Sequence, residues 1–221
     1  PLALSVSDDG LNYKNLLLVN GEITTMRYGG NYKSYGPQYV RGIQEMNGNP
    51  PGNDAWVSYS VNKEDMWVAK IPVPVKSSVT GTVADDFNLL KDGAELDNWN
   101  IYSPLWAPVS VMKAKGKKVL SLKDFDPFDL AKAERVVPEA SKVKIEFSVT
   151  PQQSSNGRLD IEVQDSRNTP CLRISFDSTG EIITKAGYRD RGLTSYEAGK
   201  EYSFVIEVDT KTRLYTISIN G

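Results

Sequence analysis

The chain has 221 residues, of which 39% are hydrophobic, enough to bury one large core or two small ones. Its net charge of −2, from 26 basic and 28 acidic residues, gives no electrostatic reason to expect nucleic acid or an anionic membrane as a partner. The sequence contains no histidine, which excludes Ser-His-Asp and Cys-His catalysis and histidine-ligated zinc. No stretch approaches the roughly 18–20 apolar residues of a membrane span.

The first third of the chain, residues 1–75, is rich in Gly, Asn and Tyr and consists of short strand-forming runs between turn signals. These runs predict strands at Leu2–Ser7, Asn15–Val19, Gln38–Gln44, Ala55–Ser60 and Met66–Val73. Prolines at 72 and 74 predict an extended exit from this region, because each proline fixes its own φ and disfavours helix in the residue before it. Residues 76–82 are predicted to be a small polar linker.

The remaining residues, 83–221, alternate between apolar and polar side chains along 143–149, 159–163, 172–176 and 202–208. Such alternation is typical of an antiparallel sheet with one buried and one solvated face. Repeated strands of this kind predict a β-sandwich of the jelly-roll type, and only Asp126–Ala133 has a helical pattern. We expect the shared core to contain Val143, Ile145, Phe147, Ile161, Phe204 and Ile206. The single cysteine, Cys171, excludes an internal disulfide, and its apolar neighbours predict a buried side chain.

The two ends of the chain predict a segment of a longer protein. Asn220-Gly221 follows an alternating strand, and this pair is the strongest short signal for a hairpin turn because both central residues of a type I′ turn need φ > 0. We therefore expect a strand that returns after Gly221. At the other end, the sequence enters directly as a strand at Leu2.

The first third resembles a sialidase-like β-propeller. Ser7-Asp8-Asp9-Gly10-Leu11-Asn12-Tyr13 resembles an Asp-box, in which the Asp caps backbone amides in a turn and the aromatic residue packs between strands. Arg27–Ile43, with 52–54 and 56–67, looks like the closing blades of propellers in secreted bacterial polysaccharide-degrading proteins. The resemblance implies that residues 1–75 are the last blades and that chain upstream of Pro1 supplies the rest of the propeller as their partner.

The second part resembles a concanavalin-like (laminin-G-like) sandwich. Ala84–Asn88, with Leu96–Trp99, is similar to the opening strand of that class, and 208–221 to a late strand. The predicted fold is therefore all-β: terminal blades of a β-propeller in residues 1–75, a linker in 76–82, and a concanavalin-like jelly-roll β-sandwich in 83–221 that continues past Gly221.

The propeller resemblance implies a substrate site on loops near Arg41. Sialidase-like propellers aim arginines at the carboxylate of the substrate, because a guanidinium pairs with a planar anion through two hydrogen bonds. A period of two places Arg41 on the same strand face as Tyr39, whereas a structural ion pair is the alternative. Tyr32, Tyr35 and Tyr39 flank glycine turns, and they either stack on sugar rings or pack between blades.

Acidic residues elsewhere give weaker signals. Glu64 and Asp65 lie in a predicted hairpin turn and either act as acid or base or have no function there. Asp85 and Asp86 offer the hard oxygen donors that calcium prefers, and some related sandwiches carry such an ion, so a structural calcium is the one metal or cofactor expected.

Other aromatic and acidic residues allow both a functional and a structural interpretation. Trp99, Tyr102 and Trp106 either form a sugar platform or are buried in the sandwich. The irregularly spaced Asp124, Asp126 and Asp129 are interpreted as a solvated loop.

The resemblance implies the C-terminal part of a secreted, periplasmic or cell-surface carbohydrate-active protein. The parent would be a bacterial glycoside hydrolase acting on glycans, acidic ones included, with the sandwich as support or as a glycan-binding module. The alternative is a non-catalytic glycan-binding or adhesion module. In both cases a glycan or polysaccharide is the partner, the catalytic residues are unknown, and the segment alone is expected to be inactive.

Overall fold

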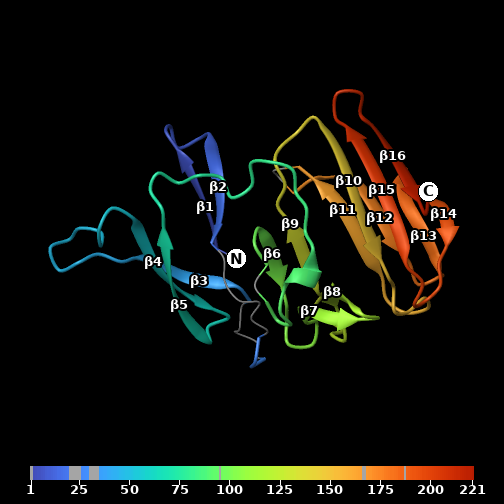
Figure 1. The fold of residues 1–221 in the computed structure, drawn as a ribbon, viewed down its shortest axis with the longest axis horizontal. Helices are drawn as coiled ribbons and strands as arrows, with labels where there is room; N and C mark the ends of the chain where they lie inside the picture. Colours follow the sequence, from blue (N-terminus) through green and yellow to red (C-terminus); the bar gives the residue numbers. More distant parts are fainter. Residues whose placement is uncertain (1, 20–25, 30–34, 95, 166–167, 187) are drawn as a thin grey trace. The chain divides into compact units, whose positions relative to one another are not determined.

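The computed structural model describes every residue except 1, 20–25, 30–34, 95, 166–167 and 187. The described residues form antiparallel β-strands and one short 3₁₀ helix, which confirms the predicted all-β class (Figure 1). They divide into two compact units, Pro1–Pro138 and Glu139–Gly221. None of the helical structure in this described part is long and apolar enough to cross a membrane.

The first unit begins with two small antiparallel sheets. A hairpin pairs β1 (Leu2–Ser7) with β2 (Tyr13–Val19), and a three-stranded sheet has the order β3 (Pro37–Gly42), β4 (Ala55–Val61), β5 (Asp65–Ile71). The turn between β1 and β2 is organised by Asp9, whose Oδ1 accepts the backbone amides of Leu11 and Asn12 at 2.8 and 2.7 Å. The aromatic residue after this turn, Tyr13, is 69% exposed.

The rest of the first unit consists of two short strand pairs. After η1 (Phe87–Leu89), β6 (Trp99–Tyr102) pairs with β9 (Lys132–Arg135), and β7 (Val109–Ala114) pairs with β8 (Lys117–Leu122). The buried side chains of this region include Ala107, Val109 and Val111.

The predicted helix at Asp126–Ala133 is wrong, because residues 126–131 form a loop and Lys132 and Ala133 are the first residues of β9. Asp126 and Asp129 turn their side chains back onto the backbone: the Asp126 carboxylate accepts the Phe128 amide, and the Asp129 carboxylate accepts the Leu130 amide, both at 2.9 Å. Aspartate bonded in this way stabilises turns and competes with helix formation.

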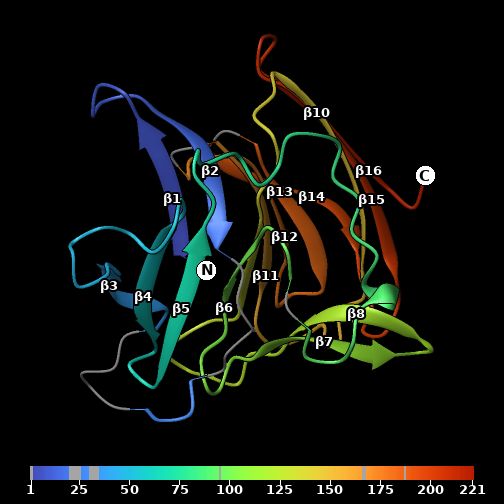
Figure 2. The same ribbon diagram turned by 60° about the vertical axis from the view of Figure 1, so that its left-hand side comes forward.

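The second unit contains two antiparallel sheets. One has the order β10 (Lys142–Val149), β15 (Tyr202–Asp209), β16 (Leu214–Ile219). The other has the order β11 (Leu159–Gln164), β12 (Pro170–Phe176), β13 (Glu181–Ala186), β14 (Arg189–Ser195). Figure 2 shows the two sheets face to face, and one hydrophobic cluster draws side chains from both. This unit lies wholly inside the range 83–221 that the sequence assigns to the sandwich.

The core between these sheets follows the predicted alternation. Phe204 and Ile206 on β15 are each 1% exposed, and the Phe147 ring stacks on the Phe204 ring with centroids 5.1 Å apart. Ile145, Phe147 and Ile161 are partly buried against the same cluster, while Val143 is half-buried and lies outside it. Burying a side chain of this size stabilises a fold by about 1.5–3 kcal/mol.

The prediction that the Cys171 side chain is buried is wrong, because this side chain is exposed. Leu172, Ile174 and Phe176 alternate along β12 and are all buried, and this alternation turns Cys171 outward. Its thiol donates a hydrogen bond to the carbonyl oxygen of Val163 at 3.3 Å. Partial loss of solvation raises the pKa of the thiol.

The last two residues have the backbone geometry that their sequence predicts. Asn220 and Gly221 both have positive φ, 59° and 98°. Asn220 is also tied to β15, because its Oδ1 accepts the Ser203 amide at 2.9 Å and its own amide donates to the Ser203 carbonyl at 2.8 Å.

Candidate functional site

The predicted loop tyrosines have different surroundings. Tyr32 lies outside the described residues. Tyr35 is half-buried and meets the Tyr102 ring edge to face, with centroids 4.4 Å apart. Its hydroxyl donates to the carbonyl oxygen of Ile101 at 3.4 Å, and burial raises the pKa of Tyr35 to about 12.

Tyr102 continues this cluster on its other side. Its hydroxyl donates to Oδ2 of Asp129 at 2.6 Å, and burial together with that carboxylate raises the pKa of Tyr102 to about 12. Both phenols are therefore protonated at neutral pH and serve as hydrogen-bond donors. This arrangement ties three segments of the first unit together.

Arg41 and Tyr39 lie on β3, the edge strand of its sheet. The pairing of β3 with β4 contains a bulge, since Gln38 is opposite Ser60 and Arg41 is opposite Ser58. Tyr39 sits in this bulge with φ of 54° and is 63% exposed. The alternation that places Tyr39 and Arg41 on one face is interrupted there, because a bulge inserts one extra residue.

The Arg41 side chain is exposed, and the described residues place no carboxylate in ion-pair contact with it. A guanidinium in this position is chemically able to bind an anionic group from solution. Its role in substrate binding stays a prediction.

Glu64 and Asp65 hold a neighbouring segment in place. The Glu64 side chain is only 2% exposed and accepts the backbone amides of Arg27 and Tyr28, each at 2.9 Å. The Arg27 guanidinium donates to Asp65 at 2.8 Å. These contacts favour a structural role for the turn over the acid–base alternative.

Asp85 and Asp86 both have partners within the chain. Arg135 donates to both oxygens of Asp85, at 2.7 and 3.2 Å, and Asp86 caps η1 by accepting the Asn88 amide at 2.9 Å. Calcium takes six to eight oxygen ligands, and no group of three or more metal-binding side chains is found among the described residues. An ion at Asp85 would have to displace Arg135. The calcium site stays a prediction.

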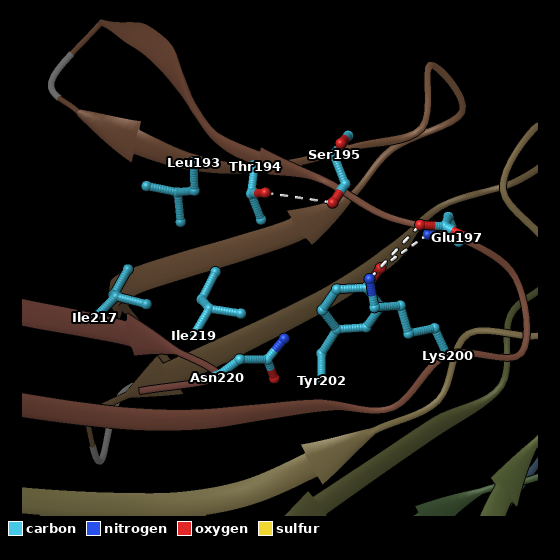
Figure 3. A pocket seen from close by; sticks show the side chains of 9 residues that line it. All are labelled: Leu193, Thr194, Ser195, Glu197, Lys200, Tyr202, Ile217, Ile219 and Asn220. Atoms are coloured by element: carbon cyan, nitrogen blue, oxygen red, sulfur yellow. Dashed lines mark hydrogen bonds and ion pairs between the residues drawn. The ribbon is translucent and has the colours of Figure 1, made fainter.

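The second unit contains a cavity of about 410 Å³ at one edge of its two sheets (Figure 3). Strand β14 ends one sheet and β16 ends the other, and both line the cavity together with Tyr202 of β15. The lining residues are Leu193, Thr194, Ser195, Glu197, Lys200, Tyr202, Ile217, Ile219 and Asn220. Figure 3 shows the aliphatic residues gathered on one side and Glu197, Lys200 and Tyr202 on the other.

The polar side of this cavity is a small hydrogen-bonded group. The Tyr202 hydroxyl accepts the Glu197 amide at 2.9 Å, and the Lys200 ammonium lies 3.6 Å from the Glu197 carboxylate. Lys200 also lies 5.8 Å from the centre of the Tyr202 ring. A carboxylate, an ammonium and an amide beside an apolar wall suit a small hydroxylated ligand, and among the described lining residues none forms a nucleophile–base pair.

Sequence reasoning missed this cavity. Its residues come from 193–202 and 217–220, and only the strand order brings the edges β14 and β16 to the same place. The sequence marks Asn220 as a turn residue, and a turn signal does not predict that this residue lines a cavity.

The three aromatic residues considered as a sugar platform are separated. Trp99 is half-buried beside Phe87, with ring centroids 6.0 Å apart, and Tyr102 packs on Tyr35. Trp106 is 63% exposed, so it alone of the three presents most of its ring to solvent.

Comparisons with known proteins give one family and one solved structure. The family model described as "Sialidase-like, CBM domain" matches residues 99–221. A solved structure titled "Sialidase" is 49% identical to this chain, covers 100% of it and superposes with a TM-score of 0.70. The match covers 20% of that sialidase, so this chain spans about a fifth of its length. No match is found among curated proteins.

The family model extends over more than half of the 221 residues, and both the cavity and Trp106 lie within the matched range. On this ground the chain belongs to the sialidase-like CBM-domain family.

Proposed function

We propose that this chain is the non-catalytic, glycan-binding part of a longer sialidase-like glycoside hydrolase. The observation that carries the proposal is the match of residues 99–221 to a carbohydrate-binding family. The likeness to a protein titled "Sialidase", of which this chain spans about a fifth, supports a parent that degrades glycans.

The site geometry supports binding in preference to turnover. The sequence has no histidine, and the acidic residues considered for chemistry, Glu64 and Asp65, are engaged by Arg27 and by backbone amides. Most glycosidases use two carboxyl groups that face each other across the scissile bond, and sialidases use a tyrosine nucleophile in place of one of them. The exposed Arg41 and the mixed polar and apolar cavity offer contacts for glycans instead.

The proposed function also implies where the parent protein works and which glycans this chain binds. A module that binds polysaccharide would work where polysaccharide occurs, so we place the parent outside the cytoplasm: secreted, periplasmic or at the cell surface. The exposed guanidinium of Arg41 favours acidic glycans among its ligands.

Native affinity electrophoresis tests the proposal. The purified chain is run through gels that contain neutral polysaccharides (β-glucan, xylan, galactan) or acidic ones (polygalacturonate, hyaluronan), and the same mixtures are assayed for new reducing ends. We expect retardation by at least one polymer and no release of reducing ends. Retardation by none of the panel would overturn glycan binding, and turnover by this chain would overturn the non-catalytic role.

A further inference from the structure

The β7–β8 hairpin continues beyond its assigned strands. Its last pair is Val109 with Leu122, and two further backbone bonds keep the same register. The Lys123 amide donates to the Pro108 carbonyl at 3.0 Å, and the Phe125 amide donates to the Trp106 carbonyl at 2.8 Å. The backbones of Trp106 and Phe125 are therefore joined by a hydrogen bond, with Trp106 in the turn that leads into β7.

This pair is exposed, although its neighbours are not. Trp106 is 63% and Phe125 77% exposed, whereas Ala107 and Val109 are at most 1% exposed. Aromatic rings gain stability from burial, so two of them held in solvent on one short ladder contribute little to folding. Exposed aromatic surface of this kind is typical of a binding site.

The backbone beneath the two rings is held firmly. The Ser103 hydroxyl, which is fully buried, accepts the Val109 amide at 2.9 Å. The Ala107 amide donates to the Pro104 carbonyl at 3.1 Å and closes a turn that contains Trp106. A ligand that binds here has little backbone left to order, so the entropic penalty of binding is small.

The charges beside the pair favour an uncharged ligand rich in hydroxyl groups. Asp124 and Asp126 precede and follow Phe125, and each uses Oδ1 to accept a backbone amide, from Asp126 and from Phe128. Carboxylates in these positions accept hydrogen bonds from sugar hydroxyls and repel the carboxylate of an acidic sugar. Lys123 is the one basic residue among residues 123–130.

We propose that Trp106 and Phe125 form a stacking platform for the apolar face of neutral pyranose rings in a polysaccharide, a site that rests on the proposed glycan-binding function. The platform is distinct from both the edge-strand Arg41 and the cavity of the second unit. Its expected ligand is a neutral polymer, because the two flanking aspartates disfavour an anionic one.

The test uses the affinity gels with neutral and acidic polysaccharides and four variants of the full chain. We expect Trp106→Ala and Phe125→Ala each to weaken retardation by neutral polymers roughly tenfold, which corresponds to about 1.4 kcal/mol. Trp106→Phe should lose less, because a ring remains. The control Tyr188→Ala removes a fully exposed aromatic residue from the second unit and should change nothing.

The outcomes separate this proposal from the proposed function. If a neutral polymer retards the unsubstituted chain, and Trp106→Ala and Phe125→Ala bind that polymer as tightly, the proposed platform is wrong and glycan binding stands. If these variants lose only acidic polymers, the choice of ligand is wrong. If the unsubstituted chain binds no polymer, both proposals fail. Thermal unfolding midpoints equal to that of the unsubstituted chain show that the variants are folded, as expected for exposed positions.

Discussion

The two units of this chain bury their apolar side chains in different ways. In Glu139–Gly221, two sheets share one cluster of buried residues. In Pro1–Pro138, the sheets have two or three strands, and the buried residues are divided among them. Among the described residues, every large hydrophobic side chain that is exposed lies in the first unit except Tyr188, Leu193 and Leu214.

Similar strand-forming sequences are thus stabilised in two ways, by a shared apolar core or by specific polar contacts. A pair of facing sheets removes apolar surface from water on its own. Small sheets hold their shape by specific polar contacts instead, such as Glu64 with the amides of Arg27 and Tyr28, and leave apolar surface available for recognition.

The strongest test of this comparison removes the centre of the two-sheet core. Phe204→Ala should lower the free energy of unfolding of the second unit by about 3–5 kcal/mol, because it empties the space between Phe147 and Phe176. Urea unfolding followed by circular dichroism measures the change. The control Leu214→Ala, at a position 68% exposed, should change it by less than about 0.5 kcal/mol. Equal effects of the two variants would contradict the core described above.

A second substitution tests the polar stabilisation of the first unit. Glu64→Gln weakens two hydrogen bonds to a buried carboxylate and should lower stability by about 1–3 kcal/mol. Limited proteolysis should show earlier cleavage within 1–138 and unchanged cleavage within 139–221. Glu146→Gln, at a side chain that is 61% exposed, is the matched control. If Glu64→Gln is cleaved at the same rate as the unsubstituted chain, the Glu64 carboxylate does not stabilise the first unit.

Arg41, an exposed residue of the first unit, allows a test at the level of ligand binding. Arg41→Ala should weaken retardation by acidic polysaccharides about two- to fivefold, the effect of losing one exposed ion pair, and leave neutral ones unchanged. In the complete parent protein the same variant should lose more activity on an acidic glycan than on a neutral one. Equal behaviour on both classes, with the fold intact, would assign Arg41 a purely structural role.

The smallest expected effect is the loss of stability in the β1–β2 turn when acid protonates Asp9. Hydrogen bonds from the Asn12 and Leu11 amides lower the pKa of Asp9 below its ordinary value. Its stabilisation of the β1–β2 turn is therefore complete above the unfolded pKa, about 3.9, and is lost as the pH falls through the lower folded pKa. Amide chemical shifts of Leu11 and Asn12 should move only well below pH 4, and Asp9→Asn should abolish that transition. A midpoint near 3.9 would contradict these bonds.

Local signals in the sequence predicted the strands well. The predicted strand Leu2–Ser7 is the observed β1, and Ala55–Ser60 differs from β4 by one residue, because alternation and turn residues are properties of neighbouring positions. The helix at Asp126–Ala133 failed since its aspartates bond to their own backbone, which a pattern of apolar positions does not register.

Features that depend on pairing between distant segments were beyond the sequence. The bulge at Tyr39 breaks a period of two, and it becomes visible only from the register between β3 and β4. The cavity and the Trp106–Phe125 pair each need a strand order or register that joins separate segments. The sequence groups Trp106 with Trp99 and Tyr102 as a candidate sugar platform, and Phe125 gives no signal.

The exposed thiol of Cys171 gives this protein a natural attachment point for chemistry. Because it is the single cysteine of the chain and lies on β12, a maleimide dye or spin label would report on the second unit without any engineered residue. A cysteine thiol is mostly protonated at neutral pH, and the raised pKa of Cys171 lowers its thiolate fraction further, so labelling should be faster in mildly alkaline buffer. The same protonation slows air oxidation, and the purified protein should therefore form disulfide-linked dimers only slowly.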